Sequence, residues 1–216
     1  MQPSSRQIAA AKAAVFALAL VPFGWLATGA LFLPDWLTAN PGEFIDRETG
    51  RWTLRLLLIT LAMTPLRLLT GWSWLLRFRR MLGLFAFFYG VMHLSSYMTF
   101  RRVFDVDEIV RDITERPFMT VGFAALLLMI PLAVTSTNAM VRRLGARRWR
   151  LLHRLVYVIA PLGVLHYWFM VKRDITQPAI YAAILAALLG WRVAARLRER
   201  QRAIRMPRPS RSATGA

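Results

Sequence analysis

Apolar residues are gathered into six long stretches, and short segments rich in charge separate them. The stretches cover residues 13–33, 54–70, 81–98, 118–134, 151–171 and 178–195. Each is close to the ~20 residues that a helix needs to cross a bilayer. The second is the least uniform, because Arg55 and Arg67 lie at its ends and Pro65 interrupts it. The pattern predicts an all-α membrane protein built as a bundle of six transmembrane helices.

The first stretch is interpreted as a retained helix rather than a cleaved targeting signal. It is longer than the apolar core of a signal peptide, and no convincing small-residue cleavage site follows it. Pro22 lies within it, which membrane helices tolerate. An even number of spans then places both chain termini on one side of the membrane.

The segments on the two sides of the predicted bundle differ in charge. The side that carries the termini holds most of the basic residues, namely Arg77, Arg79, Arg80, Arg142, Arg143, Arg147, Arg148, Arg150 and the arginines between 196 and 211. The opposite loops, 34–53, 99–117 and 172–177, hold ten of the eleven acidic residues, and only Glu199 lies on the basic side. The positive-inside rule therefore predicts that both termini are cytoplasmic.

The formal net charge is +18, and the calculated isoelectric point is about 11.8. A nucleic-acid-binding domain carries its basic patch on a soluble face, whereas these arginines flank apolar spans. We interpret them as orientation signals and contacts with anionic membrane lipid, and we expect no nucleic-acid partner. The chain thus divides into a cytoplasmic N-terminus (1–12), a transmembrane domain (13–195) and a basic tail (196–216) predicted to be disordered.

Composition narrows the cofactor chemistry. The chain has 216 residues, of which 56% are hydrophobic, and its mean hydropathy is +0.41. It contains no cysteine, which excludes disulfides, cysteine-ligated iron–sulfur clusters, cysteine-based zinc sites and covalent c-type haem attachment.

The polar loop at 101–116 alternates apolar and charged residues. This alternation predicts an amphipathic helix on the outer membrane surface. A docking site for a partner protein is the alternative interpretation.

The chain has only three histidines, His93, His153 and His166, and all three lie within apolar stretches. Ionisable groups inside a membrane are costly and usually functional. His93 lies in the outer half of the third stretch and His166 in the outer half of the fifth, so the two are expected at similar depth on different helices. Two facing imidazoles can ligate one haem iron from both sides. The histidines therefore predict an electron-carrying protein with b-type haem between His93 and His166.

A glycine precedes each of these two histidines by three positions, Gly90 before His93 and Gly163 before His166. A residue three positions away shares the face of the histidine, and glycine there leaves room for a flat macrocycle. The alternatives are ordinary close packing of membrane helices and a structural or proton-relay role for each histidine. A zinc site is less well supported, because no second histidine lies at i+3 or i+4 and no carboxylate lies nearby at that depth.

His153 has no histidine at a matching depth on the third stretch. It lies about 20 Å from His166 along the same predicted helix, near the cytoplasmic end. We interpret it as the ligand of a second haem with an unusual sixth ligand or none. Contact with a flavin or with a haem propionate is the alternative.

Arginines at the two ends of the bundle suit haem propionates, because guanidinium and carboxylate groups form bidentate pairs. Arg101 and Arg102 are placed for this role outside, and Arg77 and Arg80 inside. The alternative for each is a charge that orients the chain or faces lipid.

Several short segments together carry a family resemblance. They are 60–67 (TLAMTPLR), 79–84 (RRMLGL), 90–93 (GVMH), 116–122 (RPFMTVG), 131–136 (PLAVTS), 149–157 (WRLLHRLVY) and 165–167 (LHY). In combination they resemble the MsrQ (YedZ) family over roughly residues 15–195. That family comprises haem-binding membrane subunits of the bacterial protein-methionine-sulfoxide reductase system, within the ferric-reductase-like transmembrane group related to the membrane part of NADPH oxidases.

The resemblance implies one or two b-type haems, FMN as a further cofactor and a multi-pass position in the bacterial inner membrane. It implies electron delivery to the periplasmic molybdopterin reductase MsrP, which reduces methionine sulfoxide in envelope proteins. It also makes His93, His153 and His166 the haem-associated histidines. The NADPH-oxidase pattern has two histidines on each of two helices, whereas the third stretch here has one, so the number of haems stays open.

The expected function is a conduit in which a cytoplasmic donor reduces an inner cofactor and the electron leaves through the haem of His93 and His166. The chain has no glycine-rich dinucleotide fingerprint, so it needs a flavin reductase or a quinol as donor. It is expected to be an electron-transfer subunit that does not act on methionine sulfoxide by itself. One alternative is a quinol-oxidising cytochrome b that serves another periplasmic oxidoreductase. Another is a metal or solute transporter, although such proteins usually show repeated halves and buried carboxylates.

Overall fold

The computed structural model describes residues 3–33, 36–171 and 173–205, with the backbone alone for 202–205. Within these ranges the chain is helical apart from short connections, and no strand occurs, which confirms the all-α fold class. The elements are α1 (Ser5–Leu31), α2 (Pro41–Thr70), the 3₁₀ helix η2 (Ser73–Phe78), α3 (Arg79–Phe100), α4 (Val106–Glu115), α5 (Pro117–Val134), α6 (Asn138–Leu152), the 3₁₀ turn η3 (His153–Leu155), α7 (Val156–Met170) and α8 (Thr176–Arg205).

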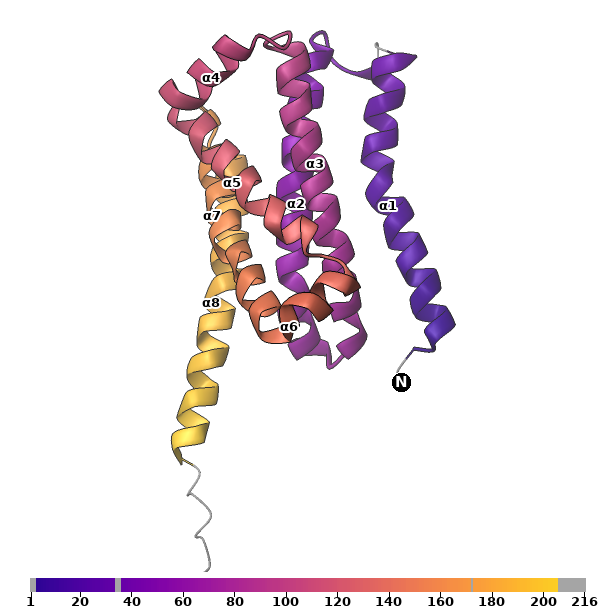
Figure 1. The fold of residues 1–216 in the computed structure, drawn as a ribbon, viewed down its shortest axis with the longest axis vertical. Helices are drawn as coiled ribbons and strands as arrows, with labels where there is room; N and C mark the ends of the chain where they lie inside the picture. The colour runs from indigo at the N-terminus through magenta and orange to yellow at the C-terminus, as the bar shows by residue number, and fades with distance from the viewer. Residues whose placement is uncertain (1–2, 34–35, 172, 206–216) are drawn as a thin grey trace, which may run out of the picture.

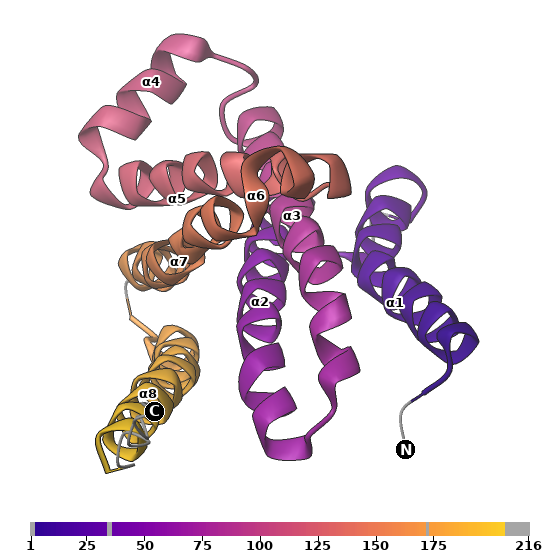
Figure 2. The ribbon, with the colours of Figure 1, turned by 60° about the horizontal axis from the view of Figure 1, so that its bottom comes forward.

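The long helices stand side by side in one bundle (Figure 1). α2 packs along α3 at its centre, α5 packs along α7, and α8 contacts both α7 and α2. α1 lies at the opposite edge from α8 and contacts α2 and α3 (Figure 2). The short helices α4 and α6 lie at opposite ends of the bundle (Figure 1), which we call the α4 end and the α6 end.

Five helical segments are long and apolar enough to cross a membrane: α1, α2, η2 with α3, α5 and α8. The sixth predicted span, 151–171, is divided. Its first two residues end α6, η3 follows, and α7 itself has 15 residues. α7 nevertheless lies within the bundle, beside α5 and α8 (Figure 2). We expected His153 and His166 on one continuous α-helix, but the 3₁₀ turn that begins at His153 precedes α7, which carries His166.

α2 begins 13 residues before the predicted start of the second span, so most of the expected loop 34–53 is helix. The Asn40 side chain caps it by accepting a hydrogen bond from the Glu43 N–H (3.1 Å), and Pro41 occupies the first turn. The charged residues of this segment pair with one another, as in the ion pair between Arg51 and Glu48. The charged residues of this segment are therefore part of α2 and do not mark its start.

At the other terminus, α8 continues to Arg205, beyond the predicted boundary at 195. The first part of the predicted disordered tail, 196–205, is thus helical, while residues 206–216 lie outside the described ranges. The loop at 101–116 contains the predicted amphipathic helix, α4. The Asp105 side chain caps α4 by accepting from the Glu108 N–H (3.0 Å).

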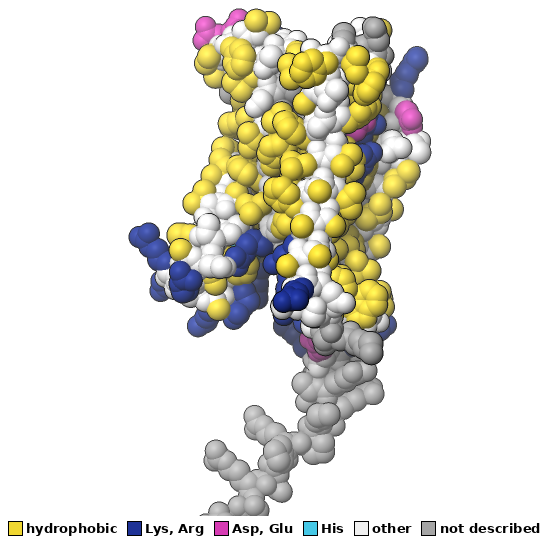
Figure 3. Space-filling model, turned by 90° about the vertical axis from the view of Figure 1, so that its right-hand side faces the viewer, with side chains coloured by type: hydrophobic (Ala, Val, Ile, Leu, Met, Phe, Trp, Pro, Cys, Tyr) yellow, Lys and Arg dark blue, Asp and Glu magenta, His cyan; other side chains and the backbone are white. Residues whose placement is uncertain are grey.

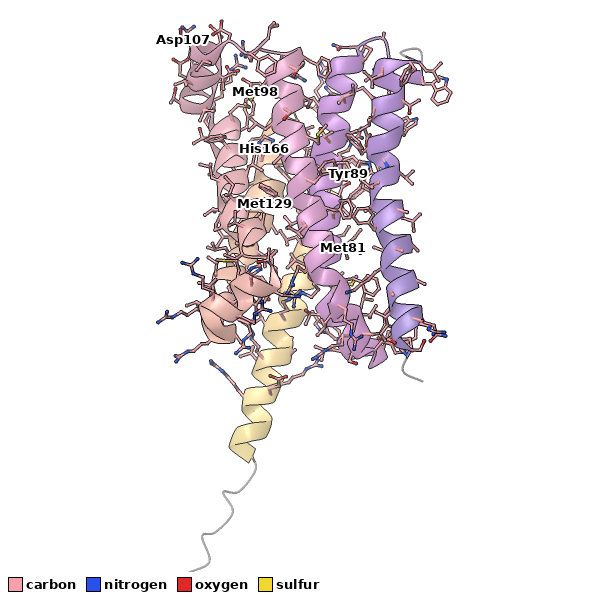
Figure 4. The ribbon with its side chains drawn as sticks, turned by 45° about the vertical axis from the view of Figure 1, so that its right-hand side comes forward. Met81, Tyr89, Met98, Asp107, Met129 and His166 are labelled. Carbon is pink, nitrogen blue, oxygen red and sulfur yellow. The ribbon has the colours of Figure 1, made fainter. Side chains whose placement is uncertain are left out.

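Tyr89 fixes α1 to the rest of the bundle. It is fully buried, and its hydroxyl donates to the Ala19 carbonyl (2.7 Å) and accepts from the Phe23 N–H (3.0 Å). These two backbone groups are i and i+4 partners in a regular helix, and the hydroxyl is bound to both beside Pro22. Figure 4 shows Tyr89 on the side of α3 that faces α1. The Tyr89 side chain of α3 is thus hydrogen-bonded to two backbone groups of α1 close to Pro22.

The outer surface of the bundle is apolar over much of its height. Large apolar side chains such as Leu18, Leu69 and Val134 are more than 60% exposed. On the face shown in Figure 3, Lys and Arg side chains gather at the α6 end, below a broad apolar surface. An apolar belt bounded by charge is typical of a protein that spans a bilayer.

Candidate cofactor site

A cavity of about 1040 Å³ lies between α2, α3, α5 and α7 and extends toward the α4 end. This volume is at the upper end of the range of cofactor sites, roughly 300–1,000 Å³. Apolar side chains form most of its inner wall, among them Leu54, Leu57, Leu126, Met129 and Ile159. Charged side chains surround its α4 end. The cavity can therefore receive a flat, largely apolar group whose polar substituents point toward α4.

His93 from α3 and His166 from α7 meet across this cavity. Their ring centroids are 6.0 Å apart, and the planes of the rings differ by 71°. Figure 4 shows His166 nearer to the α4 end than Met129 is. The sequence prediction that these two histidines share a depth is therefore matched by the geometry.

Each of the two imidazoles is held by its Nδ1 atom. His93 Nδ1 lies 2.8 Å from the Asp46 carbonyl oxygen, and His166 Nδ1 lies 2.7 Å from the Phe118 carbonyl oxygen. A carbonyl can only accept, so each Nδ1 carries the hydrogen and each Nε2 keeps its lone pair. Metal-bound histidines are oriented in this way, by a hydrogen bond from the nitrogen that does not bind the metal.

The separation of the rings also suits a shared metal ion. Two metal–imidazole bonds of about 2 Å, with the distance from each nitrogen to its ring centre, place the centroids about 6 Å apart. The observed 6.0 Å agrees with this value. No group of three or more His, Cys, Asp or Glu side chains that could hold a metal ion occurs among the described residues.

Two glycines that the sequence analysis did not single out lie against the histidine rings. A Cβ atom at Gly50 would lie 3.1 Å from His93 Cε1, and one at Gly122 would lie 2.6 Å from His166 Nδ1. The contact at Gly122 is too close for a methyl group, and the one at Gly50 is tight enough that the His93 ring would have to shift by a few tenths of an ångström. Glycine therefore lets each ring approach the backbone of the neighbouring helix. Because both glycines are distant from the histidines in the sequence, no local spacing could predict these contacts.

The predicted glycines Gly90 and Gly163 both line the cavity. A Cβ atom at Gly90 would lie 3.1 Å from Leu126 Cδ1, and one at Gly163 would meet only Leu54 Cδ1, at 3.5 Å. Gly90 therefore permits close packing of α3 on α5, whereas Gly163 leaves space on the cavity wall.

Asp46 is a buried carboxylate beside His93, with 4% of its surface exposed. Its Oδ1 atom lies 3.1 Å from His93 Nδ1 and accepts from the Ser96 hydroxyl (3.2 Å). Its Oδ2 atom accepts from Arg101 Nε (3.0 Å). Asp46 was expected only as an acid of an outer loop, and the expectation that no carboxylate lies near the histidines at their depth is wrong, because α2 begins before this residue and carries it to His93. If the second helix is extended backward from residue 54, Gly50 and Asp46 follow at intervals of four residues and so lie on the same face of the helix. This spacing would have placed Asp46 on the cavity face.

Arginines line the cavity at the α4 end: Arg47, Arg51, Arg101, Arg102 and Arg116. Arg101 and Arg102 were predicted for this position. The Nε atom of Arg51 is buried and has no hydrogen-bond partner among the described residues. A carboxylate-bearing group in the cavity would supply an acceptor for such a donor.

Asp112 of α4 ties this rim together. It pairs with Arg102 and with Arg116, whose Nε lies 2.7 Å from Asp112 Oδ1, and it accepts from the Tyr97 hydroxyl. Burial raises the pKa of the Asp112 carboxyl, but the hydrogen bonds from Tyr97 and Arg102 and the two positive charges outweigh it, so the pKa is lowered from 3.8. Asp112 therefore stays ionised and holds α4 over the cavity mouth.

The remaining predicted site residues lie away from the cavity, at the α6 end. The Nε2 atom of His153 lies 3.1 Å from the Thr135 hydroxyl, and its ring stacks on Trp149 with centroids 3.9 Å apart. Arg80 donates to the Asn138 side chain (2.6 Å) and so joins α3 to α6. Arg77 is exposed on η2. The cavity thus brings together His93, His166 and the predicted outer arginines, and it does not include these three residues.

Comparisons with known proteins identify the family of the chain. Residues 49–164 match the family model described as "Ferric reductase like transmembrane component". A protein of Herminiimonas arsenicoxydans is 57% identical over 194 residues, which cover 88% of each chain. One of Ralstonia nicotianae is 57% identical over 87% of each chain, and one of Azospira oryzae is 52% identical over 98% of this chain and 88% of its own. All three carry the name protein-methionine-sulfoxide reductase heme-binding subunit MsrQ.

Proposed function

Because the chain belongs to the MsrQ family, within the ferric-reductase-like transmembrane proteins, we propose that it is a b-type haem electron-transfer subunit of a protein-methionine-sulfoxide reductase system. The observation that carries the proposal is the pair of imidazoles of His93 and His166. They face each other 6.0 Å apart with each Nδ1 held by a carbonyl. Both free Nε2 atoms are then available to one iron.

The residues around this pair fit haem in three respects. Gly50 and Gly122 allow the two rings to lie against neighbouring helices. The apolar inner wall excludes water, and the unpartnered Nε of Arg51 offers a donor at the charged rim. When bound, haem supplies reversible one-electron chemistry, while the protein fixes its position and tunes its potential.

Each group of the chain then has a defined task. The Nε2 atoms of His93 and His166 would hold the iron, and the Asp46 and Phe118 carbonyls keep the rings in orientation. Asp46 places a negative charge beside His93, which makes that imidazole a stronger electron donor. Arg51, Arg101 and Arg116 face the acidic substituents at the rim.

The direction of electron flow follows from topology. We propose that α7 completes a set of six spans, with both termini and the α6 end in the cytoplasm and the α4 end in the periplasm of a bacterial inner membrane. The cavity extends toward the α4 end, so the haem lies near the side on which the partner reductase, MsrP, would dock. The electrons come from a cytoplasmic flavin reductase or a quinol. The chain itself does not reduce methionine sulfoxide.

We assign one haem to the cavity. A second haem at His153 would require this imidazole to leave its bond to Thr135 and its stacking on Trp149. FMN, which the resemblance implies, belongs to the proposal as a carrier on the donor side, with no residue assigned to it.

A reduced-minus-oxidised absorption spectrum of the purified full-length protein tests the proposal. We expect b-type haem bands with one haem per chain, and reoxidation of that haem when MsrP and methionine sulfoxide are added. A protein without b-type bands would refute the haem assignment. Bands whose reoxidation does not depend on MsrP would refute the proposed acceptor and leave the cofactor assignment intact.

A further inference from the structure

Two arginines place a buried Nε atom inside the bundle toward the α6 end: Arg192, which is buried as a whole, and Arg79, which is half-buried. Arg192 of α8 is 9% exposed, and its two terminal nitrogens donate to the carbonyls of Leu188 (2.7 Å) and of Leu61 in α2. Its guanidinium lies over the ring of Tyr157, 5.8 Å from the centroid. The Nε atoms of both Arg192 and Arg79 are buried and have no hydrogen-bond partner among the described residues.

These arginines have no acidic partner in the part of the chain that the structure describes. Every ion pair there joins side chains of α2, α3, α4 or the segments next to α4, and none includes Arg79, Arg80 or Arg192. Glu199 is the only acid on this side of the sequence. It is exposed and lies about 10 Å further along α8 than Arg192.

The positive charges also lie close to one another. Neighbouring residues of α2 connect them: Arg192 donates to the Leu61 carbonyl, and a Cβ atom at Gly83, one turn after Arg79, would lie 3.9 Å from the Thr60 side chain. Buried charge without a counter-charge is unfavourable, and removing one member of a buried pair is strongly destabilising. An anion from outside the chain would balance this cluster.

The aromatic residues nearby indicate where this cluster lies relative to a bilayer. Trp72 and Trp74 stack on each other 5.6 Å apart immediately before Arg79, and Trp191 precedes Arg192. Trp72 is 51% exposed and Trp191 is 40% exposed. Exposed tryptophans gather at the level of the lipid headgroups. Because Arg79 and Arg192 follow these tryptophans in the sequence, we place both arginines at the depth of headgroup phosphates.

We propose that Arg79 and Arg192 form a binding site for the phosphate of an anionic phospholipid, held between α2, α3 and α8 at the α6 end. Guanidinium groups match phosphate oxygens in geometry and charge. Basic pockets between membrane helices on the cytoplasmic side are known to hold anionic headgroups. The site is separate from the haem cavity and does not depend on the haem assignment; it rests on the proposed function only for the cytoplasmic position of the α6 end.

Native mass spectrometry of the full-length protein, purified in detergent and stripped of lipid, tests the proposal by titration with phosphatidylglycerol. The wild type is expected to bind one molecule tightly and to bind phosphatidylcholine much less. Arg79→Gln and Arg192→Gln should each weaken phosphatidylglycerol about tenfold, as expected for the loss of a hydrogen bond to a charged group. Arg147→Gln, which removes an exposed arginine of α6, is the matched control and should bind like the wild type.

A folding control and a competition with inorganic phosphate complete the experiment. Helix content by circular dichroism shows whether each variant folds. If Arg192→Gln does not fold, the lipid affinity of Arg79→Gln decides whether the site exists. Equal binding by wild type and Arg79→Gln would overturn the site, as would an equal loss in Arg147→Gln. Displacement of the lipid by millimolar inorganic phosphate would overturn the lipid as occupant and assign the arginines to a free phosphate group.

Discussion

His93 and His166 come from helices that are distant in sequence, yet their ring centroids lie 6.0 Å apart, and a backbone carbonyl holds the Nδ1 atom of each. This relationship makes the two residues similar as potential ligands, because the carbonyl contact of each Nδ1 leaves the Nε2 of a neutral ring as the nitrogen available to a metal. It also makes them different in their surroundings. His93 lies beside the carboxylate of Asp46, whereas His166 contacts only a neutral carbonyl through Nδ1.

Replacing either histidine should remove the haem. We expect His93→Ala and His166→Ala to lose nearly all bound haem, because one imidazole alone leaves an axial position of the iron empty. His153→Ala is the matched control and should keep full haem, since that ring is engaged with Thr135 and Trp149 away from the cavity. The measurement is the haem-to-protein ratio of purified variants. Full haem in either of the first two would disprove the ligand assignment.

A methyl group at Gly122 should disturb His166. Its Cβ would lie 2.6 Å from Nδ1, so Gly122→Ala must push the ring away from the Phe118 carbonyl. Loss of such a supporting contact lowers metal retention by roughly tenfold to 100-fold. Gly24→Ala has nothing within 4 Å of the new Cβ and serves as a control with the same change in a helix. The same haem retention in both variants would show that the cradle is not needed.

Asp46 should set the potential of the bound haem. Asp46→Asn removes the negative charge that lies beside His93 Nδ1. Loss of this charge should stabilise the reduced haem relative to the oxidised haem. We expect the midpoint potential to rise on the order of 50 mV, close to a tenfold change for a one-electron couple. Ser96→Ala keeps the carboxylate and should change the potential far less. Redox potentiometry followed by optical spectra checks this, and an unchanged or lower potential in Asp46→Asn would contradict it.

Tyr89→Phe should loosen α1. The change removes the two hydrogen bonds that join α3 to the Ala19 carbonyl and the Phe23 N–H, and losing a hydrogen bond of this kind costs about 0.5–1.5 kcal/mol. The free energy of unfolding in mixed micelles measures this loss. Tyr157→Phe removes a hydroxyl for which the structure shows no hydrogen bond, and it should be close to neutral. Equal stability of the two variants would mean that the hydroxyl of Tyr89 does not anchor α1.

Acid should release α4 from the rim. The folded-state pKa of Asp112 is lowered below 3.8, so its ionised form adds stability that is fully present above that value. This contribution is lost as the pH falls through the lower folded pKa. Asp112→Asn should remove the dependence and leave α4 equally exposed at every pH. Hydrogen exchange of residues 106–115 between about pH 5 and pH 2 measures the effect, and identical profiles for wild type and variant would argue against it.

Much of the site was within reach of the sequence. The pairing of His93 with His166 required only two apolar stretches, their direction through the bundle and the depth of each residue within them. Arg101 and Arg102 followed in the same way, from their place at the end of a span. Asp46, Gly50 and Gly122 did not, because each acts across a gap between helices that no local spacing reveals.

The sequence by itself determined the helical class, the apolar belt, the asymmetry of charge and the two histidines that meet, since these depend on composition and on position along the chain. The tertiary structure decided which glycines the rings touch, which carboxylate lies beside His93, and where a 3₁₀ segment interrupts the α-helix at His153. The reason is physical: hydrophobicity acts residue by residue, whereas helix rotation and packing are fixed by contacts between distant segments.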